Sequence, residues 1–127
     1  IEHAGVIAKF FSQAKENKDI TIYGDGSQRR NFSMVLDVVK GTLLSAIKDR
    51  AIGEIINIAS EKEYTVKEIA ESIIKITNSK SEIVFLDPLK GDPMRNKADV
   101  SKANKMLEFQ ADYDLQEGLE YIYKKLF

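Results

Sequence analysis

Two kinds of apolar pattern alternate along this chain, and the alternation limits the folds that it can adopt. Residues 5–15 and 66–77 repeat apolar side chains at steps of three and four, which predicts amphipathic helices. Residues 19–23 and 82–86 are short runs rich in β-branched residues, which predicts strands. Because no internal repeat or linker divides the chain, we predict a single domain over residues 1–127, of the α/β class, with more helices than strands.

Local signals predict where several helices begin. Thr65 and Glu68 have the spacing of a capping box, in which each side chain accepts a hydrogen bond from the backbone N–H of the other residue. Asp114 and Glu117 repeat this spacing before the last helix. Asp37 is predicted to cap a helix that continues to Lys48.

Two further segments are predicted to be extended. Residues 54–59 are nearly all apolar, so we predict a central strand there. Residues 24–27 contain Gly24 and Gly26, which adopt positive φ without strain, and the segment 30–35 behind them alternates weakly. The residues alone favour a hairpin turn at this point.

Composition excludes several classes of function. Among the 127 residues there is no cysteine, which excludes disulfides and thiolate catalysis, and His3 is the single histidine. The formal net charge is −1, which argues against a nucleic-acid partner. No apolar run reaches the roughly 18 residues that cross a bilayer and no signal peptide opens the sequence, so we expect no membrane partner and a cytoplasmic location. The first residue, Ile1, is not Met, as expected for a fragment of a longer protein.

Three places could carry chemistry, each with a plain structural alternative. Arg29 and Arg30 follow the turn and could bind a phosphate or pyrophosphate, although solvated charges on a hairpin are the interpretation that the residues alone favour. Arg95 could bind an anion or be solvated in its loop, and the two alternatives are equal. Tyr121 and Lys125 have the spacing of a tyrosine acid/base with its lysine, but they lie on a terminal amphipathic helix, and we interpret them as structural.

Five other residues are interpreted as having no part in the chemistry. Gly24 and Gly26 lack the third glycine of a dinucleotide-binding turn, so we predict that they do not form a phosphate cradle. Asn57 is expected to be hydrogen-bonded to a neighbouring loop, and Asp99 to stabilise the N-terminus of the helix that follows it. His3 is expected to be exposed and without a role.

Taken in order, these stretches resemble the extended short-chain dehydrogenase/reductase family, and within it the NAD-dependent nucleotide-sugar epimerases and dehydratases such as UDP-glucose 4-epimerase. The resemblance is collinear over essentially the whole chain. Its motifs are Gly5-Val6-Ile7, Ile22-Tyr23-Gly24-Asp25-Gly26-Ser27-Gln28, Arg30-x-Phe32-x-x-Val35-x-Asp37, Ile56-Asn57-Ile58-Ala59-Ser60, Gly91-Asp92, Ala98-Asp99-Val100-Ser101-Lys102-Ala103 and Leu115-x-Glu117-Gly118-Leu119.

The resemblance implies that the chain is the smaller, C-terminal, substrate-binding part of such an enzyme, without the Rossmann half. The Gly-rich NAD-binding turn and the catalytic residues belong to the N-terminal half of the family, and no residue of this chain matches them. The resemblance therefore implies NAD as the cofactor of the full-length parent, with none bound by this chain alone, and no turnover by this chain alone. The implied partner is a nucleotide-diphosphate sugar, foremost a UDP-sugar.

The resemblance also implies roles for individual residues. Ile22 and Tyr23 occupy the strand that lines the nucleoside in the family, and Val6 and Ile7 lie near its base pocket. Two arginines complete the set: Arg30 matches the arginine that binds the diphosphate, and Arg95 lies in the loop that supplies further diphosphate or ribose contacts.

The sequence departs from the family pattern at Arg29, Asn31, Met34, Leu36, Leu89 and Asn96, which leaves the base and the sugar open. Two alternatives to a piece of an enzyme also remain. One is a stand-alone nucleotide-sugar binding module without chemistry. The other is a protein-interaction module, in which the helix with Phe10 and Phe11 or the last helix contacts a partner, with a dimer formed through exposed apolar surface.

Overall fold

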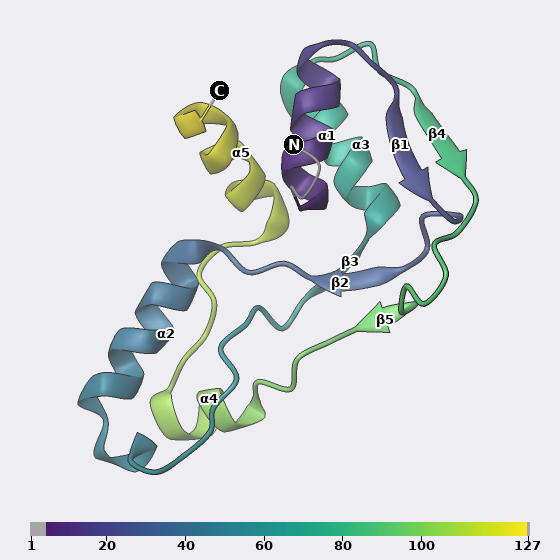
Figure 1. The fold of residues 1–127 in the computed structure, drawn as a ribbon. Coiled ribbons are helices and arrows are strands. Elements are labelled where there is room, and N and C mark those ends of the chain that lie inside the picture. The colour runs from purple at the N-terminus through teal and green to yellow at the C-terminus, as the bar shows by residue number, and fades with distance from the viewer. Residues whose placement is uncertain (1–4, 127) are drawn as a thin grey trace.

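The computed structural model describes residues 5–126 and contains helices joined by short strands (Figure 1). In chain order the elements are α1 (Val6–Lys15), β1 (Ile20–Tyr23), β2 (Arg29–Asn31), α2 (Val35–Ile47), a 3-10 turn (Asp49–Ala51), β3 (Glu63–Thr65), α3 (Val66–Thr77), β4 (Ile83–Leu86), β5 (Arg95–Asn96), α4 (Ser101–Leu107) and α5 (Leu115–Leu126). The α/β class predicted from the sequence is confirmed.

The strands form two small sheets. In one sheet β1 and β4 run parallel, with Ile20 opposite Ile83. In the other, β2 lies between β3, which is antiparallel to it, and β5, which is parallel to it. The predicted hairpin is therefore wrong: the turn at residues 24–27 carries the chain from the first sheet to the second, because β1 and β2 each pair with segments far away in the sequence.

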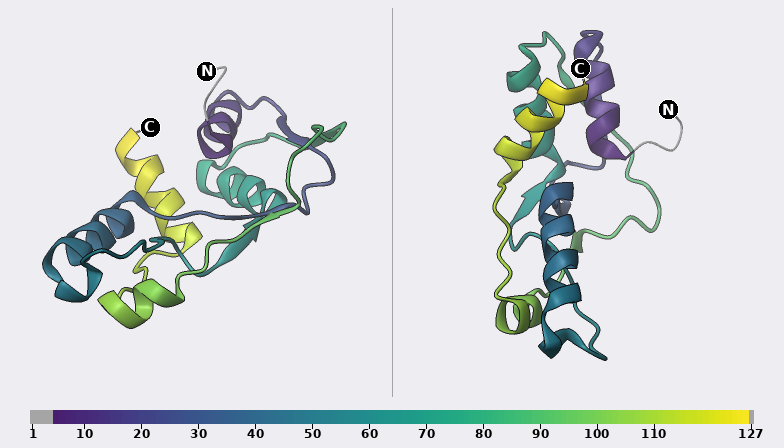
Figure 2. Two further views of the ribbon diagram at one scale, coloured as in Figure 1. Left: turned by 60° about the horizontal axis from the view of Figure 1, so that its bottom comes forward. Right: turned by 90° about the vertical axis from the view of Figure 1, so that its left-hand side faces the viewer.

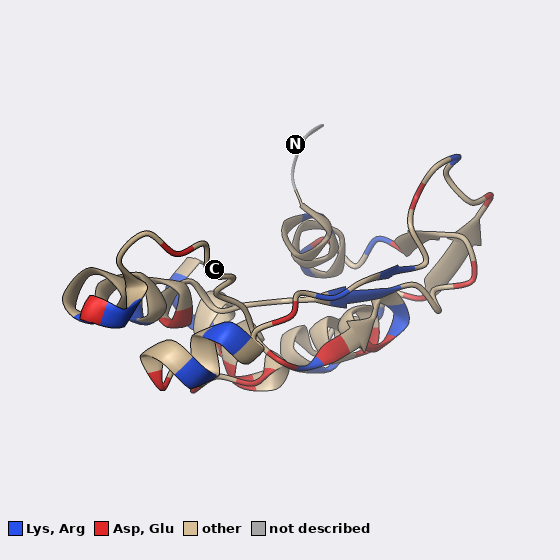
Figure 3. Ribbon diagram, turned by 90° about the horizontal axis from the view of Figure 1, so that it is seen from below, with Lys and Arg blue, Asp and Glu red and all other residues tan. Residues whose placement is uncertain are grey.

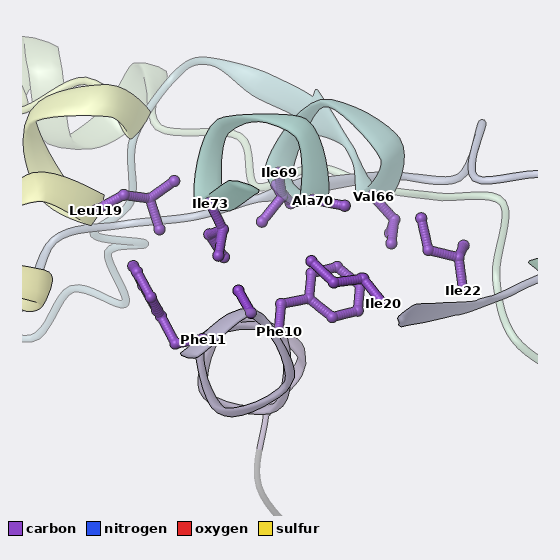
Figure 4. Close-up of a cluster of buried hydrophobic side chains, with 10 residues drawn as sticks. Phe10, Phe11, Ile20, Ile22, Val66, Ile69, Ala70, Ile73 and Leu119 are labelled. Carbon is purple, nitrogen blue, oxygen red and sulfur yellow. The ribbon is translucent and has the colours of Figure 1, made fainter. Parts of the chain in front are cut away.

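The main core lies where α1 and α5 pack against α3 (Figure 4). Phe10 and Phe11 of α1 are fully buried in it and face Ile69 and Ile73 of α3. Helical spacing places these residues on one face of each helix, as the sequence pattern predicts. Because Phe10 and Phe11 are buried in this core, these two side chains are not available to a partner protein.

A second, smaller core holds the other end of the molecule together, where α2 and α4 lie side by side (Figure 2). It is built on Ala103, Leu107 and Phe109, with Ile56 and Ile58 packed against them. Residues 54–59 do not form the predicted central strand: they have no strand partner, and Ile55 is 90% exposed. The apolar character of this segment is explained instead by Ile56 and Ile58, whose side chains pack against the core beside α4.

Both predicted capping boxes are confirmed. The Thr65 hydroxyl accepts a hydrogen bond from the Glu68 N–H at 3.1 Å, and the Glu68 carboxylate accepts one from the Thr65 N–H at 2.7 Å. The Thr65 N–H and the Thr65 hydroxyl, which donates at 2.9 Å, both bind the Glu68 carboxylate and lower the pKa of Glu68 below its usual range. At α5 the N–H groups of Asp114 and Glu117 each donate to the other residue's carboxylate at 2.9 Å.

Asp37 does not cap a helix, contrary to prediction. It lies in the first turn of α2, which begins after Met34, and its carboxylate is buried. Both oxygens accept backbone hydrogen bonds, one from Asp112 at 2.9 Å and the other from Tyr113 at 3.2 Å. Asp37 therefore ties α2 to the segment before α5, a contact that local sequence cannot reveal.

The roles predicted for Asp99 and Asn57 are observed. Asp99 Oδ1 accepts a hydrogen bond from the Ser101 N–H at 2.9 Å, at the start of α4. Asn57 donates to the Asp99 carbonyl at 3.1 Å, although its side chain is exposed rather than buried. His3 lies outside the described residues.

The outer face of α2 is apolar and exposed. Val35, Val39, Leu43 and Ile47 follow one another at every fourth position, with exposed fractions of 63%, 49%, 61% and 74%. This face has no covering element among residues 5–126. Within the same range, no helix has the length and hydropathy that a membrane span requires.

Candidate functional site

A cavity of about 460 Å³ lies between α1, β1 and β2, beside the main core. Its volume is within the range of small-molecule sites. It is lined by Val6, Lys9, Phe10, Thr21, Ile22, Tyr23, Gln28, Arg30, Val66, Leu89 and Asp92.

The apolar residues of the lining are also residues of the core. Phe10 and Ile22 are fully buried in it, Val66 begins α3, and Val6 packs against the same cluster. Because these side chains come from three packed elements, this apolar lining is rigid. A flat, apolar ring such as a nucleobase could be buried against it.

The turn after β1 brings polar side chains to the rim of the cavity. Gly24 and Gly26 both have positive φ, at 79° and 78°, the conformation that the sequence predicts for them. Between them, the Asp25 carboxylate accepts hydrogen bonds from the N–H and the hydroxyl of Ser27, at 2.9 and 2.6 Å. These bonds lower the pKa of Asp25 and fix the turn that leads into Gln28.

Arg30 supplies a partly buried guanidinium to the cavity. Its Nη2 lies 2.5 Å from Oδ1 of Asp92, and its Nη1 donates to the Arg29 carbonyl at 2.8 Å. The neighbouring strands β2 and β5 both carry arginine, in the middle of the molecule (Figure 3). An anion that enters the cavity would meet Arg30 as its principal cation and would compete with Asp92 for it.

Tyr23 and Gln28 complete the rim. The Lys9 ammonium lies 5.2 Å from the centre of the Tyr23 ring, in cation–π contact. The Gln28 side chain is 6% exposed, and its Nε2 donates to the Tyr23 carbonyl at 2.6 Å. A positive charge and an exposed aromatic ring therefore lie side by side at the mouth of the cavity.

The structure thus brings together Val6, Ile22, Tyr23 and Arg30 of the predicted site residues. Ile7, although next to Val6, faces other apolar pockets, beside Phe32 and Ile122. Helical geometry explains the difference, since consecutive residues of a helix point about 100° apart.

Arg95 does not line this cavity. The pairing of β2 with β5 places Arg95 opposite Arg29 and Asn96 opposite Arg30, so Arg95 lies on the other face of the sheet. There its guanidinium donates twice to the carboxylate of Glu63, at 2.8 and 2.6 Å. This pairing lowers the pKa of Glu63 and raises that of Arg95.

Several residues of the lining were missed by the sequence reasoning, among them Lys9, Gln28 and Asp92. Gln28 and Asp92 belong to the stretches that carry the family resemblance, which was a signal that could have found them. Lys9 had no such signal, because its role depends on the position of α1 over Tyr23.

The Gly24–Gly26 turn does not have the structure of a dinucleotide-binding turn. The Gly24–Gly26 turn leads into β2 and not into a helix, so it has no helix N-terminus to receive a pyrophosphate. Residues 5–126 also contain no cluster of three or more metal-ligating side chains. Tyr121 and Lys125 lie on α5, away from the cavity lining, with the Lys125 ammonium 6.0 Å from the Tyr121 ring centre.

Comparison with known proteins places this fold among enzymes of one family. The family model described as "NAD dependent epimerase/dehydratase family" matches residues 2–59. A UDP-N-acetyl-alpha-D-glucosaminuronate decarboxylase of Bacillus cytotoxicus is 37% identical over 124 residues. The match covers 93% of this chain and 38% of the relative.

Solved structures agree with the sequence matches. An epimerase from Methanothermobacter thermautotrophicus aligns with a TM-score of 0.92 and 30% identity, over 96% of this chain and 37% of the other. A UDP-glucose 4-epimerase of Thermotoga maritima, solved with UDP-glucose, aligns with a TM-score of 0.86 and 32% identity, over 98% of this chain and 41% of the other. The chain therefore spans about two fifths of the length of these proteins.

Proposed function

The chain belongs to the NAD-dependent epimerase/dehydratase family, and from this premise we propose that its cavity binds the nucleotide-diphosphate part of a UDP-sugar. In this proposal the chain is the substrate-binding portion of a sugar epimerase, dehydratase or decarboxylase. It does not catalyse a reaction alone. The full-length parent binds NAD through the portion that this chain does not span.

One observation carries the proposal: an apolar lining and a guanidinium meet in a single cavity of about 460 Å³. A nucleoside diphosphate combines a flat ring with two anionic groups, and it needs both features at once. Val6 and Ile22 offer the apolar lining, while Arg30 is the partly buried cation. The relative solved with UDP-glucose supports the choice of a uracil nucleotide.

Each side chain has a defined role in this proposal. Val6 and Ile22 contact the base, and Tyr23 covers it from the mouth of the cavity. Arg30 exchanges its Asp92 partner for the diphosphate. Asp92 then becomes free to accept hydrogen bonds from hydroxyl groups of the ligand.

The chemistry of the cavity explains why the chain alone is proposed to be inactive. Redox epimerisation, dehydration and decarboxylation of a sugar need a hydride acceptor, which bound NAD supplies. They also need an acid/base group close to the sugar. Asp92 is the one carboxylate of the cavity lining, and it is paired with Arg30. This chain therefore contributes binding and orientation.

The proposal is tested by titrating the chain with UDP, dTDP and GDP while recording amide NMR spectra. We expect UDP to shift the amides of Ile22, Tyr23 and Arg30, with a dissociation constant on the order of millimolar. The affinity is expected to be weak because the chain spans only about two fifths of the length of its relatives, so in this proposal part of the substrate site is missing. Uridine is the matched control, since it keeps the base but lacks the diphosphate.

The outcome decides the proposal. Shifts at the cavity with UDP, and much weaker ones with uridine, support a diphosphate site. The absence of any shift at several times a millimolar concentration contradicts the proposal. Equal shifts with all three nucleotides support the diphosphate site and contradict the choice of uracil.

A second function, association through an apolar surface, is favoured by the exposed face of α2. Its stripe of Val35, Val39, Leu43 and Ile47 is uncovered in this chain, and such faces drive association. For the chain by itself we propose a second copy as the partner. Sedimentation velocity over a concentration series should show a dimer that Leu43→Glu with Ile47→Glu abolishes, and a monomer at all concentrations would contradict it.

A further inference from the structure

Asn31 is the last residue of β2 and follows Arg30 directly. Because successive side chains of a strand point to opposite faces of a sheet, Arg30 faces the cavity and Asn31 faces away from it. Asn31 is accordingly not part of the cavity lining. Its side chain nevertheless makes three hydrogen bonds, and all three are to backbone groups.

These three bonds join β2 to the segments beside both of its neighbours. Nδ2 of Asn31 donates to the carbonyls of Ser60 and Lys62, at 3.1 and 2.8 Å, in the segment that leads into β3. Oδ1 accepts a hydrogen bond from the Ala98 N–H at 2.6 Å, just after β5. Since β2 lies between β3 and β5, one side chain connects the middle strand to segments on both sides of it.

The partners of Asn31 allow only one orientation of its amide. Two of them are carbonyls, which can only accept, and the third is an N–H group, which can only donate. Exchanging the nitrogen and oxygen of the amide would place an acceptor against two acceptors. The side chain is therefore held in one rotation, and it fixes the end of β2 relative to both neighbouring segments.

The backbone pairing of β2 is short, so this side chain matters to its position. β2 pairs with β3 over three residues and with β5 over two. The ion pair between Glu63 and Arg95 on the same face joins β3 to β5 across the sheet and involves no side chain of β2. Among the side-chain contacts on this face, those of Asn31 hold β2 itself.

We propose that Asn31 is a positioning residue for Arg30, and that it keeps the guanidinium in the orientation that binds the diphosphate. This inference rests on the proposed function. Any shift of β2 at Asn31 passes to the adjacent Cα of Arg30 and displaces the end of its long side chain. The contacts of that guanidinium, with the Arg29 carbonyl at 2.8 Å and with Asp92 at 2.5 Å, depend on its place. A binding group loses affinity when the residues that support it are loose.

Arginine side-chain NMR spectra of the ligand-free chain test the inference. The chain has four arginines, so single substitutions can assign their side-chain signals. We expect separate, slowly exchanging Nη signals for Arg30 in the wild type, because both Nη atoms have partners. Asn31→Ala should broaden or shift these signals. A loss of stability alone would leave the Arg30 signals of the folded chain unchanged.

Titration with UDP measures the consequence for binding. Asn31→Ala should weaken UDP binding by about three- to tenfold, an effect of the size of one neutral hydrogen bond. Arg95→Ala is the matched control, because it removes the other side-chain link on the same face. It should leave the Arg30 signals in place and change the dissociation constant by less than about threefold.

Asn31→Thr keeps the test decisive if Asn31→Ala does not fold. Threonine favours strands, and its single hydroxyl can donate to only one of the two carbonyls that Asn31 binds. We therefore expect this variant to fold and to show the same change in the Arg30 signals, with a loss of UDP affinity in the same direction.

The outcomes separate this inference from the proposed function. If the folded variants keep the Arg30 signals or the UDP affinity of the wild type, the positioning role of Asn31 is wrong. An equal effect of Arg95→Ala would also contradict it, since any loosening of the sheet would then act alike. If UDP does not bind the wild-type chain, the proposed function fails, and the Arg30 signals still decide whether Asn31 holds the guanidinium in place.

Discussion

Arg30 and Arg95 lie on paired strands of one sheet, yet they serve opposite faces of it. Arg30 enters the cavity beside α1, where it meets Asp92, whereas Arg95 is bonded by two hydrogen bonds to Glu63. Glu63 is nearly buried, with 10% of its side chain exposed. Arg95 therefore has a firmly held partner, and its position gives it no access to a ligand next to Arg30.

This relationship predicts that the arginines differ in their effect on nucleotide binding. Arg30→Ala should remove a charge-assisted hydrogen bond and weaken UDP binding by about tenfold to a hundredfold. Because the wild-type chain is expected to bind UDP only weakly, binding by this variant should no longer be detectable. Arg29→Ala and Arg95→Ala should change the dissociation constant by less than about threefold, since both side chains lie on the other face of β2 and β5. NMR titrations of the three variants provide the measurement. Equal losses in Arg29→Ala and Arg30→Ala would show that the strand register is misassigned.

The ion pair between Arg30 and Asp92 predicts that a carboxylate limits the affinity of the cavity for anions. Asp92→Asn should free the Arg30 guanidinium and raise the affinity for inorganic pyrophosphate by up to about fivefold. This factor corresponds to the free energy of a partly exposed ion pair. Pyrophosphate is the suitable probe because it contains no ribose or sugar hydroxyl that Asp92 could bind. Isothermal titration calorimetry measures the effect.

Asp87→Asn is the matched control for Asp92→Asn. Asp87 lies in the same loop and is exposed, so its replacement changes the net charge by the same amount. We expect it to have no more than a small effect on pyrophosphate binding. A similar gain in both variants would mean that net charge, rather than the contact with Arg30, sets the affinity.

The features predicted correctly from the sequence are those that local residues determine. Each capping box is complete within four consecutive residues, and both were found. The buried faces of α1 and α3 also follow from spacing alone. Of the residues that the family resemblance implied for the site, Val6, Ile22, Tyr23 and Arg30 line one cavity, and their role in binding stays a prediction.

The features that were missed depend on contacts between distant segments. Residues 54–59 have the composition of a buried strand, but their apolar side chains pack on α4 and no strand lies beside them. Asp37 has the composition of a helix cap, but its carboxylate binds backbone N–H groups 75 and 76 residues later. Arg95 was grouped with Arg30 by its loop, and only the register of β2 and β5 separates them.

The capping box of α3 predicts a specific dependence of stability on pH. The Thr65 N–H and hydroxyl hold the pKa of Glu68 below its usual range in the folded chain. The stabilisation is therefore fully present above the pKa of Glu68 in the unfolded chain, and it is lost as the pH falls through the lower pKa of the folded chain. Glu68→Gln should lower the free energy of unfolding at pH 7. The difference in free energy of unfolding between this variant and the wild type should become smaller towards pH 3.

Urea denaturation between pH 3 and pH 7 measures this difference. Thr65→Ala should cost about 1 kcal/mol at pH 7, because it removes the acceptor for the Glu68 N–H. Glu71→Gln is the control on the same helix, since Glu71 makes only an exposed ion pair with Lys67 at 3.8 Å. A pH profile for Glu71→Gln as steep as that for Glu68→Gln would contradict the role of the capping box.

Replacement by alanine should have opposite effects on stability at two glycines that lie within helices. A Cβ at Gly41 of α2 would lie 3.0 Å from Cδ1 and 3.2 Å from Cγ1 of Ile58, and closer still to its Cγ2. Ile58 is β-branched and packs against the second core, so it cannot move freely. A Cβ at Gly118 of α5 would meet only Sδ of Met34 at 3.8 Å, an ordinary contact.

Gly118→Ala should therefore stabilise the chain by about 0.5–1 kcal/mol, the gain in helix propensity. Gly41→Ala has the same gain, but overpacking against Ile58 costs about 1–3 kcal/mol, so the net effect should be a loss of up to about 2 kcal/mol. The free energies of unfolding in urea give both values. If Gly41→Ala stabilised the chain as much as Gly118→Ala, the close packing of α2 on Ile58 would be refuted. A cycle with Ile58→Ala tests the cause, because that variant removes both Cγ atoms and Cδ1, so Gly41→Ala should no longer be destabilising in its background.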